Sequence, residues 1–130
     1  MFELLIYMFE NYLSSKSYLD FNNISMELEA AGFDNDDIEE AFDWFSQLKS
    51  MSDKIPKAIN ANEKTNLRIF TEKEYKKISS EGLGFILFLE QAKVLNSVER
   101  EIIVDRAMAL NQHIISIDEV RWVVMMALWN

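Results

Sequence analysis

The sequence predicts an all-α protein, folded as a compact bundle of six or seven helices. Apolar residues recur at helical spacing along most of the chain, and Ser, Thr or Asn capping signals precede three expected helices. Only three glycines and one proline interrupt the 130 residues, which suits helices joined by few tight turns. With 49% apolar and 27% charged residues, the chain can form a globular core.

The most apolar stretch, Leu83–Leu95, is expected to be the central helix of the bundle. Large apolar residues occupy six of the seven positions from 83 to 89. At 3.6 residues per turn they surround the helix, as in helices that are buried on all sides. A buried strand is the alternative for so short an apolar run. Glu-Gln-Ala-Lys at 90–93 follows without a break and favours the helix.

The N-terminal segments predict two helices joined by a glycine turn to a third. Met1–Leu13 carries the apolar stripe of an amphipathic helix, and Ile24–Ala31 is expected to form a short second helix after a linker. Gly32 lies where a helix end favours a left-handed residue, and Phe33 is expected to plug the turn beneath it.

The third helix is expected over Asp36–Leu48, with Trp44 near the boundary of its buried face. One long loop follows at 49–66, where a proline and three asparagines disfavour regular structure. At this length we expect a single helical domain over 1–130, or two sub-units on either side of the loop. The sub-units would be 1–48 and 67–130, with 49–66 as their linker.

Three capping signals open the helices of the second half. The signals are Thr71 with Glu74, Asn96 with Glu99, and Ser116 with Glu119. The helices that they open are expected over about 72–80, 97–110 and 117–129. Gly82 and Gly84 are expected to loosen or kink the junction into the central helix, and Arg100, Glu101 and Asp105 are expected to face water.

Composition also bounds the location of the protein. The chain has no cysteine, which excludes disulfides, thiolate metal sites and cysteine nucleophiles and fits a reducing compartment. No apolar run approaches the roughly 18 residues that would suggest a membrane span. The N-terminus carries Glu3 and Glu10 but no early Lys or Arg, unlike a secretory signal. We expect a cytoplasmic protein with no membrane association.

The sequence holds no constellation typical of catalysis. Six acids between Asp34 and Asp43 invite a metal site, but an EF-hand loop would need a ligand where Ile38 stands and a glycine where Glu39 stands. His113 is the only histidine and falls in an expected interhelical turn. No nucleophile elbow, phosphate-binding loop or dinucleotide-binding spacing occurs. We therefore predict a protein that is not an enzyme, with no catalytic, cofactor-binding or metal-binding residues.

The net charge of −9 is unevenly distributed. Residues 1–48 carry a net charge of −10, residues 49–77 of +4 and residues 78–130 of −3. The total disfavours free binding to nucleic acid, but the basic segment 49–77 could contact an anion. Its candidate residues are Lys54, Lys57, Lys64, Arg68, Lys73, Lys76 and Lys77. The alternative is a solvated loop, or an internal partner for the acidic N-terminal helices.

The last expected helix has almost no polar face between Val120 and Trp129. It either lies deep in the core or offers an apolar face to a partner, for which Trp122, Met126 and Trp129 are the candidates.

Taken in order, short sequence motifs along nearly the whole chain resemble those of the Smg family of small bacterial proteins. They include Met1-Phe2-Glu3, Ala31-Gly32-Phe33, Arg68-Ile69-Phe70-Thr71, Gly84-Phe85, Phe88-Leu89-Glu90, Val94-Leu95-Asn96, Asp105-Arg106-Ala107 and Trp122-Val123. The resemblance implies no catalytic residue, because the family has no assigned activity. Its members usually continue beyond the position of Asn130, so the resemblance implies a short or trimmed chain. Its genes often lie near one for a DNA-processing protein of natural transformation.

The segment Leu28–Ala41 is similar to the Gly-Phe loop and following helix of ubiquitin-associated modules, in which this loop docks partners. The resemblance makes Gly32 and Phe33 further interaction candidates. We expect a protein-interaction or adaptor domain that binds another protein or a second copy of itself. The alternative is a nucleic-acid accessory factor, in DNA processing or transformation, that uses the basic segment.

Overall fold

The computed structural model describes residues 2–13, 21–53 and 69–129, and the regular structure in these ranges is helical. The elements are α1 (Phe2–Met8), the π-helical stretch η1 (Phe9–Leu13), α2 (Phe21–Ala30), α3 (Asn35–Asp53), α4 (Glu72–Lys77), α5 (Ser80–Gln91), α6 (Ser97–Met108) and α7 (Ile117–Trp129). The predicted all-α bundle is confirmed.

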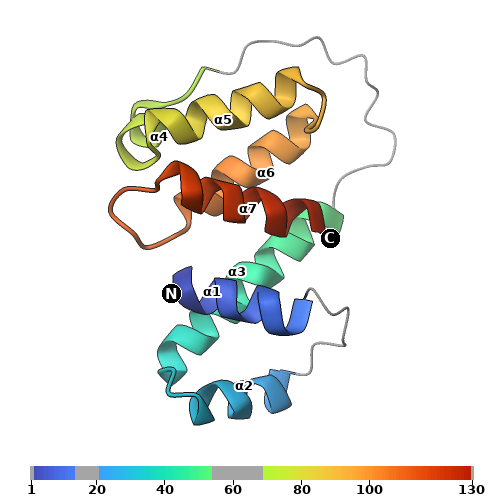
Figure 1. The fold of residues 1–130 in the computed structure, drawn as a ribbon, viewed down its shortest axis with the longest axis vertical. Helices are drawn as coiled ribbons and strands as arrows, with labels where there is room; N and C mark the ends of the chain where they lie inside the picture. The colour runs from blue at the N-terminus through green and yellow to red at the C-terminus, as the bar shows by residue number, and fades with distance from the viewer. Residues whose placement is uncertain (1, 14–20, 54–68, 130) are drawn as a thin grey trace.

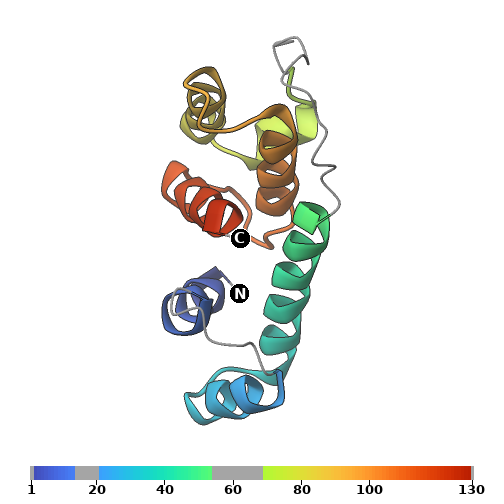
Figure 2. The same cartoon turned by 90° about the vertical axis from the view of Figure 1, so that its right-hand side faces the viewer.

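The helices form two layers. α1, α7 and α5 lie one above another on one side, while α3 and α6 lie behind them and α2 closes one end (Figures 1 and 2). α7 is the middle helix of the first layer, because it packs against α5 along one side and meets η1 through the rings of Phe9 and Trp122.

The central helix of the core is α6 rather than α5. α6 packs against α3, α4, α5 and α7, and it buries Ile102, Ile103, Val104 and Ala107. α5 is helical as expected, but it lies at an edge of the bundle and buries only Gly82, Leu83 and Ile86. The expectation of a helix buried on all sides is wrong because the outer side of α5 has no neighbour among the described helices, and Phe88 there is 63% exposed.

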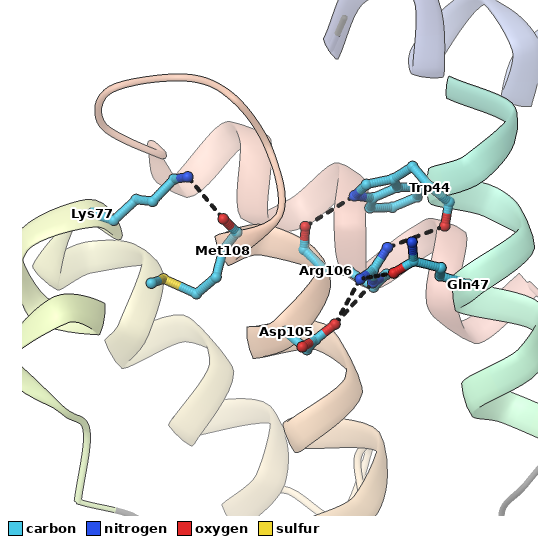
Figure 3. Close-up of polar contacts among 6 residues, drawn as sticks. All are labelled: Trp44, Gln47, Lys77, Asp105, Arg106 and Met108. Atoms are coloured by element: carbon cyan, nitrogen blue, oxygen red, sulfur yellow. Dashed lines mark hydrogen bonds and ion pairs between the residues drawn. The ribbon is translucent and has the colours of Figure 1, made fainter. Parts of the chain in front are cut away.

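A reciprocal set of hydrogen bonds joins α3 to α6 (Figure 3). The indole N–H of Trp44 donates to the carbonyl of Arg106 over 3.0 Å, and the Arg106 guanidinium donates to the carbonyl of Trp44 over 3.3 Å. The guanidinium also lies 5.7 Å from the centre of the Trp44 ring. Trp44 is therefore buried, not at the boundary of its face as expected, because Arg106 supplies its polar partner.

Arg106 is only 4% exposed, and its guanidinium has hydrogen-bond partners on two helices. It donates to Oε1 of Gln47 over 3.0 Å and to Oδ2 of Asp105 over 2.7 Å (Figure 3). A buried guanidinium is tolerated only when such partners satisfy its donors, so the pairing of α3 with α6 depends on this network.

Arg100 is also buried, which corrects the expectation that it faces water. Burial alone would lower the pKa of Arg100, but hydrogen bonds to Glu90 at 2.6 Å and Glu101 at 2.9 Å outweigh it and raise the pKa above the ordinary value. The Glu90 contact links α5 to α6. Glu101 and Asp105 are exposed, as expected.

The capping signals are confirmed. In each pair the two residues exchange hydrogen bonds, for example Thr71 N to Glu74 Oε1 at 2.8 Å and Glu74 N to Thr71 Oγ1 at 3.2 Å. Equivalent bonds join Asn96 to Glu99 and Ser116 to Glu119. Since an uncapped helix start leaves backbone donors unpaired, these pairs fix where the helices begin.

Gly32 takes the left-handed conformation that was expected, with φ at 101°. The amide of Phe33 donates to the Leu28 carbonyl over 3.1 Å and the amide of Gly32 to the Glu29 carbonyl over 3.0 Å, which is a Schellman motif. Phe33 packs partly buried against the core, as the predicted plug.

Several boundaries differ from the expectation. α2 begins at Phe21, inside the expected linker, and α3 continues to Asp53, so residues 49–53 of the expected loop are helical. The rest of that loop lies outside the described residues. The glycines do not loosen a junction, because both lie inside α5. Gly82 instead allows α5 to approach α7, and a Cβ there would meet Cγ2 of Val120 at 2.9 Å.

We expect Gly82→Ala to lower the free energy of unfolding by about 1–3 kcal/mol, because the added Cβ overpacks the contact between α5 and α7. Gly84→Ala is the matched control, since a Cβ at Gly84 meets no atom within 4 Å in the part of the chain that the structure describes. It should raise stability by about 0.5–1 kcal/mol through better helix propensity. Urea unfolding of both variants measures the difference, and equal losses would contradict the close approach.

We expect Trp44→Phe to cost about 1–3 kcal/mol, since it leaves the buried carbonyl of Arg106 without its donor. Trp122→Phe serves as the control. Trp122 is half-buried and contacts Phe9 through its ring, with centroids 6.4 Å apart. Thermal or urea unfolding compares the two, and a larger loss for Trp122→Phe would show that ring size, not the hydrogen bond, matters.

Candidate interaction surface

Four exposed apolar side chains lie on α5 and α7, and we call them the outer apolar face: Phe88, Met125, Leu128 and Trp129. Phe88 is 63% exposed, and Met125 and Trp129 are each 49% exposed. Within α7, Met125 stands three residues before Leu128 and four before Trp129, so the three share one side of the helix.

The two helices of this face run parallel and in register. Residues 78 and 115, just before their starts, form a parallel backbone bridge in which Ile115 N donates to the Lys77 carbonyl over 2.7 Å. Further along, Gly82 approaches Val120, and the Arg121 guanidinium lies 5.6 Å from the centre of the Phe85 ring. The same offset sets Phe88 level with Met125, and both side chains are exposed.

The three candidates predicted on α7 have different places. Met126 is not a surface residue, because it is 2% exposed and packs in the core, although Met125 next to it is 49% exposed. Trp122 is half-buried against Phe9. Trp129 is exposed, and its ring centre lies 5.8 Å from that of Phe9. Of the three, Trp129 alone lies on the outer apolar face.

The Gly32–Phe33 turn lies at the α2–α3 end of the molecule, away from the outer apolar face (Figure 1). Gly32 is exposed, and the Phe33 ring packs on Tyr7 of α1 with centroids 5.3 Å apart. Tyr12 donates to Glu27 over 2.6 Å, and this hydrogen bond raises the pKa of Tyr12 to about 12. These contacts hold α2 against the α1–η1 segment, so the structure assigns Phe33 a packing role.

The structure describes three of the seven predicted anion-contact residues. Lys54, Lys57, Lys64 and Arg68 lie outside the described residues. Lys73 is exposed, and Lys76 pairs with Glu72 across 3.8 Å on the surface of α4. Lys77 is half-buried, and its Nζ donates to the carbonyl of Met108 over 2.7 Å (Figure 3). That bond satisfies the C-terminal end of α6, which makes Lys77 a structural residue.

An open depression of about 410 Å³ lies between α4 and the loop that leads to α7. Its lining residues are Lys76, Lys77, Asn111, Gln112 and His113. Each of them carries a nitrogen that can donate a hydrogen bond, and no carboxylate is among them. His113 is exposed in this loop, as expected.

Within residues 2–13, 21–53 and 69–129, no three His, Cys, Asp or Glu side chains lie where they could hold a metal ion together. No helix in the same ranges has the length and apolar character to cross a membrane.

Sequence reasoning missed Phe88, Met125 and Leu128. A helical wheel over Ser80–Gln91 puts Phe88 opposite Leu83 and Ile86, which would have singled it out as the outward residue. For Met125 the signal was weaker, because apolar residues surround α7 on nearly every side.

Fold and surface together define an all-α protein with an exposed apolar face on two parallel helices. A family model described as "Protein of unknown function (DUF494)" matches residues 1–130. The chain belongs to this family.

Its curated relatives carry the name Protein Smg homolog. The protein of Methylobacillus flagellatus is 50% identical over 130 residues, which cover all of this chain and 85% of that protein. The protein of Aeromonas hydrophila is 40% identical over 133 residues, which cover 100% of this chain and 85% of that protein. The protein of Nitrosomonas europaea is 40% identical over 129 residues, which cover 99% of this chain and 84% of that protein. The resemblance to the Smg family is thereby confirmed. No solved structure matches the chain.

Proposed function

We propose that this protein is a non-enzymatic interaction domain of the cytoplasm, which binds another protein through the outer apolar face. The observation that carries the proposal is the exposure of Phe88 and Met125 at one level of two adjacent helices. Exposed apolar side chains that adjoin each other on a folded domain are typical of protein-binding surfaces.

The rigid setting of the face supports this role. α7 buries Val120, Val123 and Met126 beneath it, so Met125 is held on a well-packed helix. A preorganised surface loses little conformational entropy when a partner binds. The candidate reactive side chains lie apart from each other, with His113 in the α6–α7 loop and the acids of α3 on a different helix.

The proposal is tested by affinity capture with the full chain from a bacterial extract, followed by binding assays with each retained protein in purified form. Met125→Glu should lower the affinity for a true partner at least tenfold, because it places a charge in an apolar contact. Met26→Glu is the matched control, since Met26 is an exposed methionine on α2, at the end of the molecule away from α5. A partner that binds wild type and Met125→Glu equally would contradict the outer apolar face as the site.

The depression beside α4 favours a second candidate, a nucleic-acid accessory role through the basic segment 49–77. Lys76 and His113 face it together with two amide side chains, a set that suits a phosphate group. Lys73 extends the basic side of α4.

Under this second candidate, labelled single- or double-stranded DNA should bind at low salt, with an affinity that falls steeply as salt is added. Replacing Lys73 and Lys76 by Gln should weaken binding and reduce the salt slope by roughly one per lost phosphate contact. Lys77 is left unchanged because it caps α6. Fluorescence anisotropy measures both quantities; absence of binding at low salt, or an unchanged slope, would remove the candidate.

A further inference from the structure

We propose that the outer side of α5 binds a second copy of this chain, so that two α5 helices pair antiparallel around a two-fold axis. This inference deepens the proposed function, on which it rests, by naming the partner of the α5 part of the outer apolar face.

The outer side of α5 combines a protruding side chain with an open space. Phe88 is the most exposed residue of the outer apolar face. Gly84 precedes it by one helical turn and is exposed, and a Cβ there would meet no atom of the described residues within 4 Å. Residues four apart lie on the same side of a helix, so the Phe88 ring stands beside the gap above Gly84.

A two-fold axis makes this surface complementary to itself. In an isologous pair, residue i of one copy meets residue j of the other and the reverse contact follows by symmetry. With the axis midway between residues 84 and 88, each Phe88 lies over the Gly84 of the other copy. The same operation brings Glu81, in the first turn of α5, to the level of the last turn in the other copy, which ends at Gln91.

The charges at the two ends of α5 are opposite, as this arrangement requires. Glu81 is exposed at the N-terminal end, and Lys93 is exposed just beyond the C-terminal end. In the antiparallel pair each Glu81 meets the long side chain of the other copy's Lys93. The remaining exposed positions of this side, Ser80 and Gln91, are uncharged, so they bring no like charges together at the contact.

The backbone at Lys93 gives independent support. Its φ is 63°, the left-handed conformation that a residue with a Cβ adopts at a cost. Lys93 occupies the position in a Schellman motif at the end of α5 that Gly32 occupies at the end of α2: its amide donates to the Glu90 carbonyl and that of Val94 to the Leu89 carbonyl. Among the described residues, Lys93 is the only non-glycine with a positive φ. In the antiparallel pair, the contact with Glu81 of the other copy would offset this cost.

Sedimentation analysis of the full chain over a range of concentrations tests the inference. α5 spans about 18 Å, which makes an interface smaller than the ~1,200 Å² of stable complexes, so we expect a dimer that dissociates on dilution. Glu81→Lys and Lys93→Glu should each raise the dissociation constant roughly tenfold, because the pair occurs twice per dimer. The double variant should restore the wild-type value to within about threefold.

Two further variants separate dimerisation from folding. Lys93→Gly should raise the urea midpoint of unfolding by relieving the backbone, yet weaken the dimer. Gly84→Leu fills the gap with a good helix former, so the monomer should stay folded by circular dichroism while the dimer is lost. A wild-type chain that is monomeric at every concentration overturns the inference, as does a charge-reversed pair that fails to restore the dimer. Loss of binding to a captured protein on Met125→Glu would still support the proposed function in either case.

Discussion

The exchange of hydrogen bonds between Trp44 and Arg106 is the contact on which the arrangement of the molecule depends. These residues are 62 positions apart, and the chain between them includes residues 54–68, which lie outside the described ranges. Burial of apolar surface has no preferred direction, so it alone could hold α3 against α6 at several angles. Directional bonds that satisfy a buried guanidinium allow far fewer, so this pair fixes where the acidic N-terminal helices sit relative to α4–α7.

Local features of the fold could be predicted because local chemistry determines them. A capping pair satisfies backbone donors within four residues, and Gly32 serves the turn in which it stands, so neither depends on distant parts of the chain. Burial was harder to predict. Trp44 and Arg100 were misplaced because each is buried by a partner on another helix, and the apolar composition of α5 did not reveal that one side lacks a neighbour.

The same reasoning explains how much of the candidate surface was predictable. The apolar character of the C-terminal helix predicts a partner contact and so points to Trp129, whereas Met126 lies on the buried side of that helix. Met125 and Met126 are neighbours in the sequence, and only the packing of α7 against α5 and α6 decides which of them faces outward. The lysines of the basic segment also differ in ways that the sequence does not show. Lys77 donates a hydrogen bond to the end of α6, while Lys73 lies on the surface.

The backbone bridge between Ile78 and Ile115 makes α5 and α7 start side by side and point in the same direction. Their macrodipoles are therefore aligned, and two partially positive helix starts share one edge of the bundle. Aligned dipoles repel, but Glu81, Asp118 and Glu119 place carboxylates in the two first turns. α6, which runs the opposite way between them in the chain, supplies the opposing dipole. The carboxylates at this edge thus offset the positive field of the two helix starts. They interact with the dipoles of the helix pair as well as with solvent.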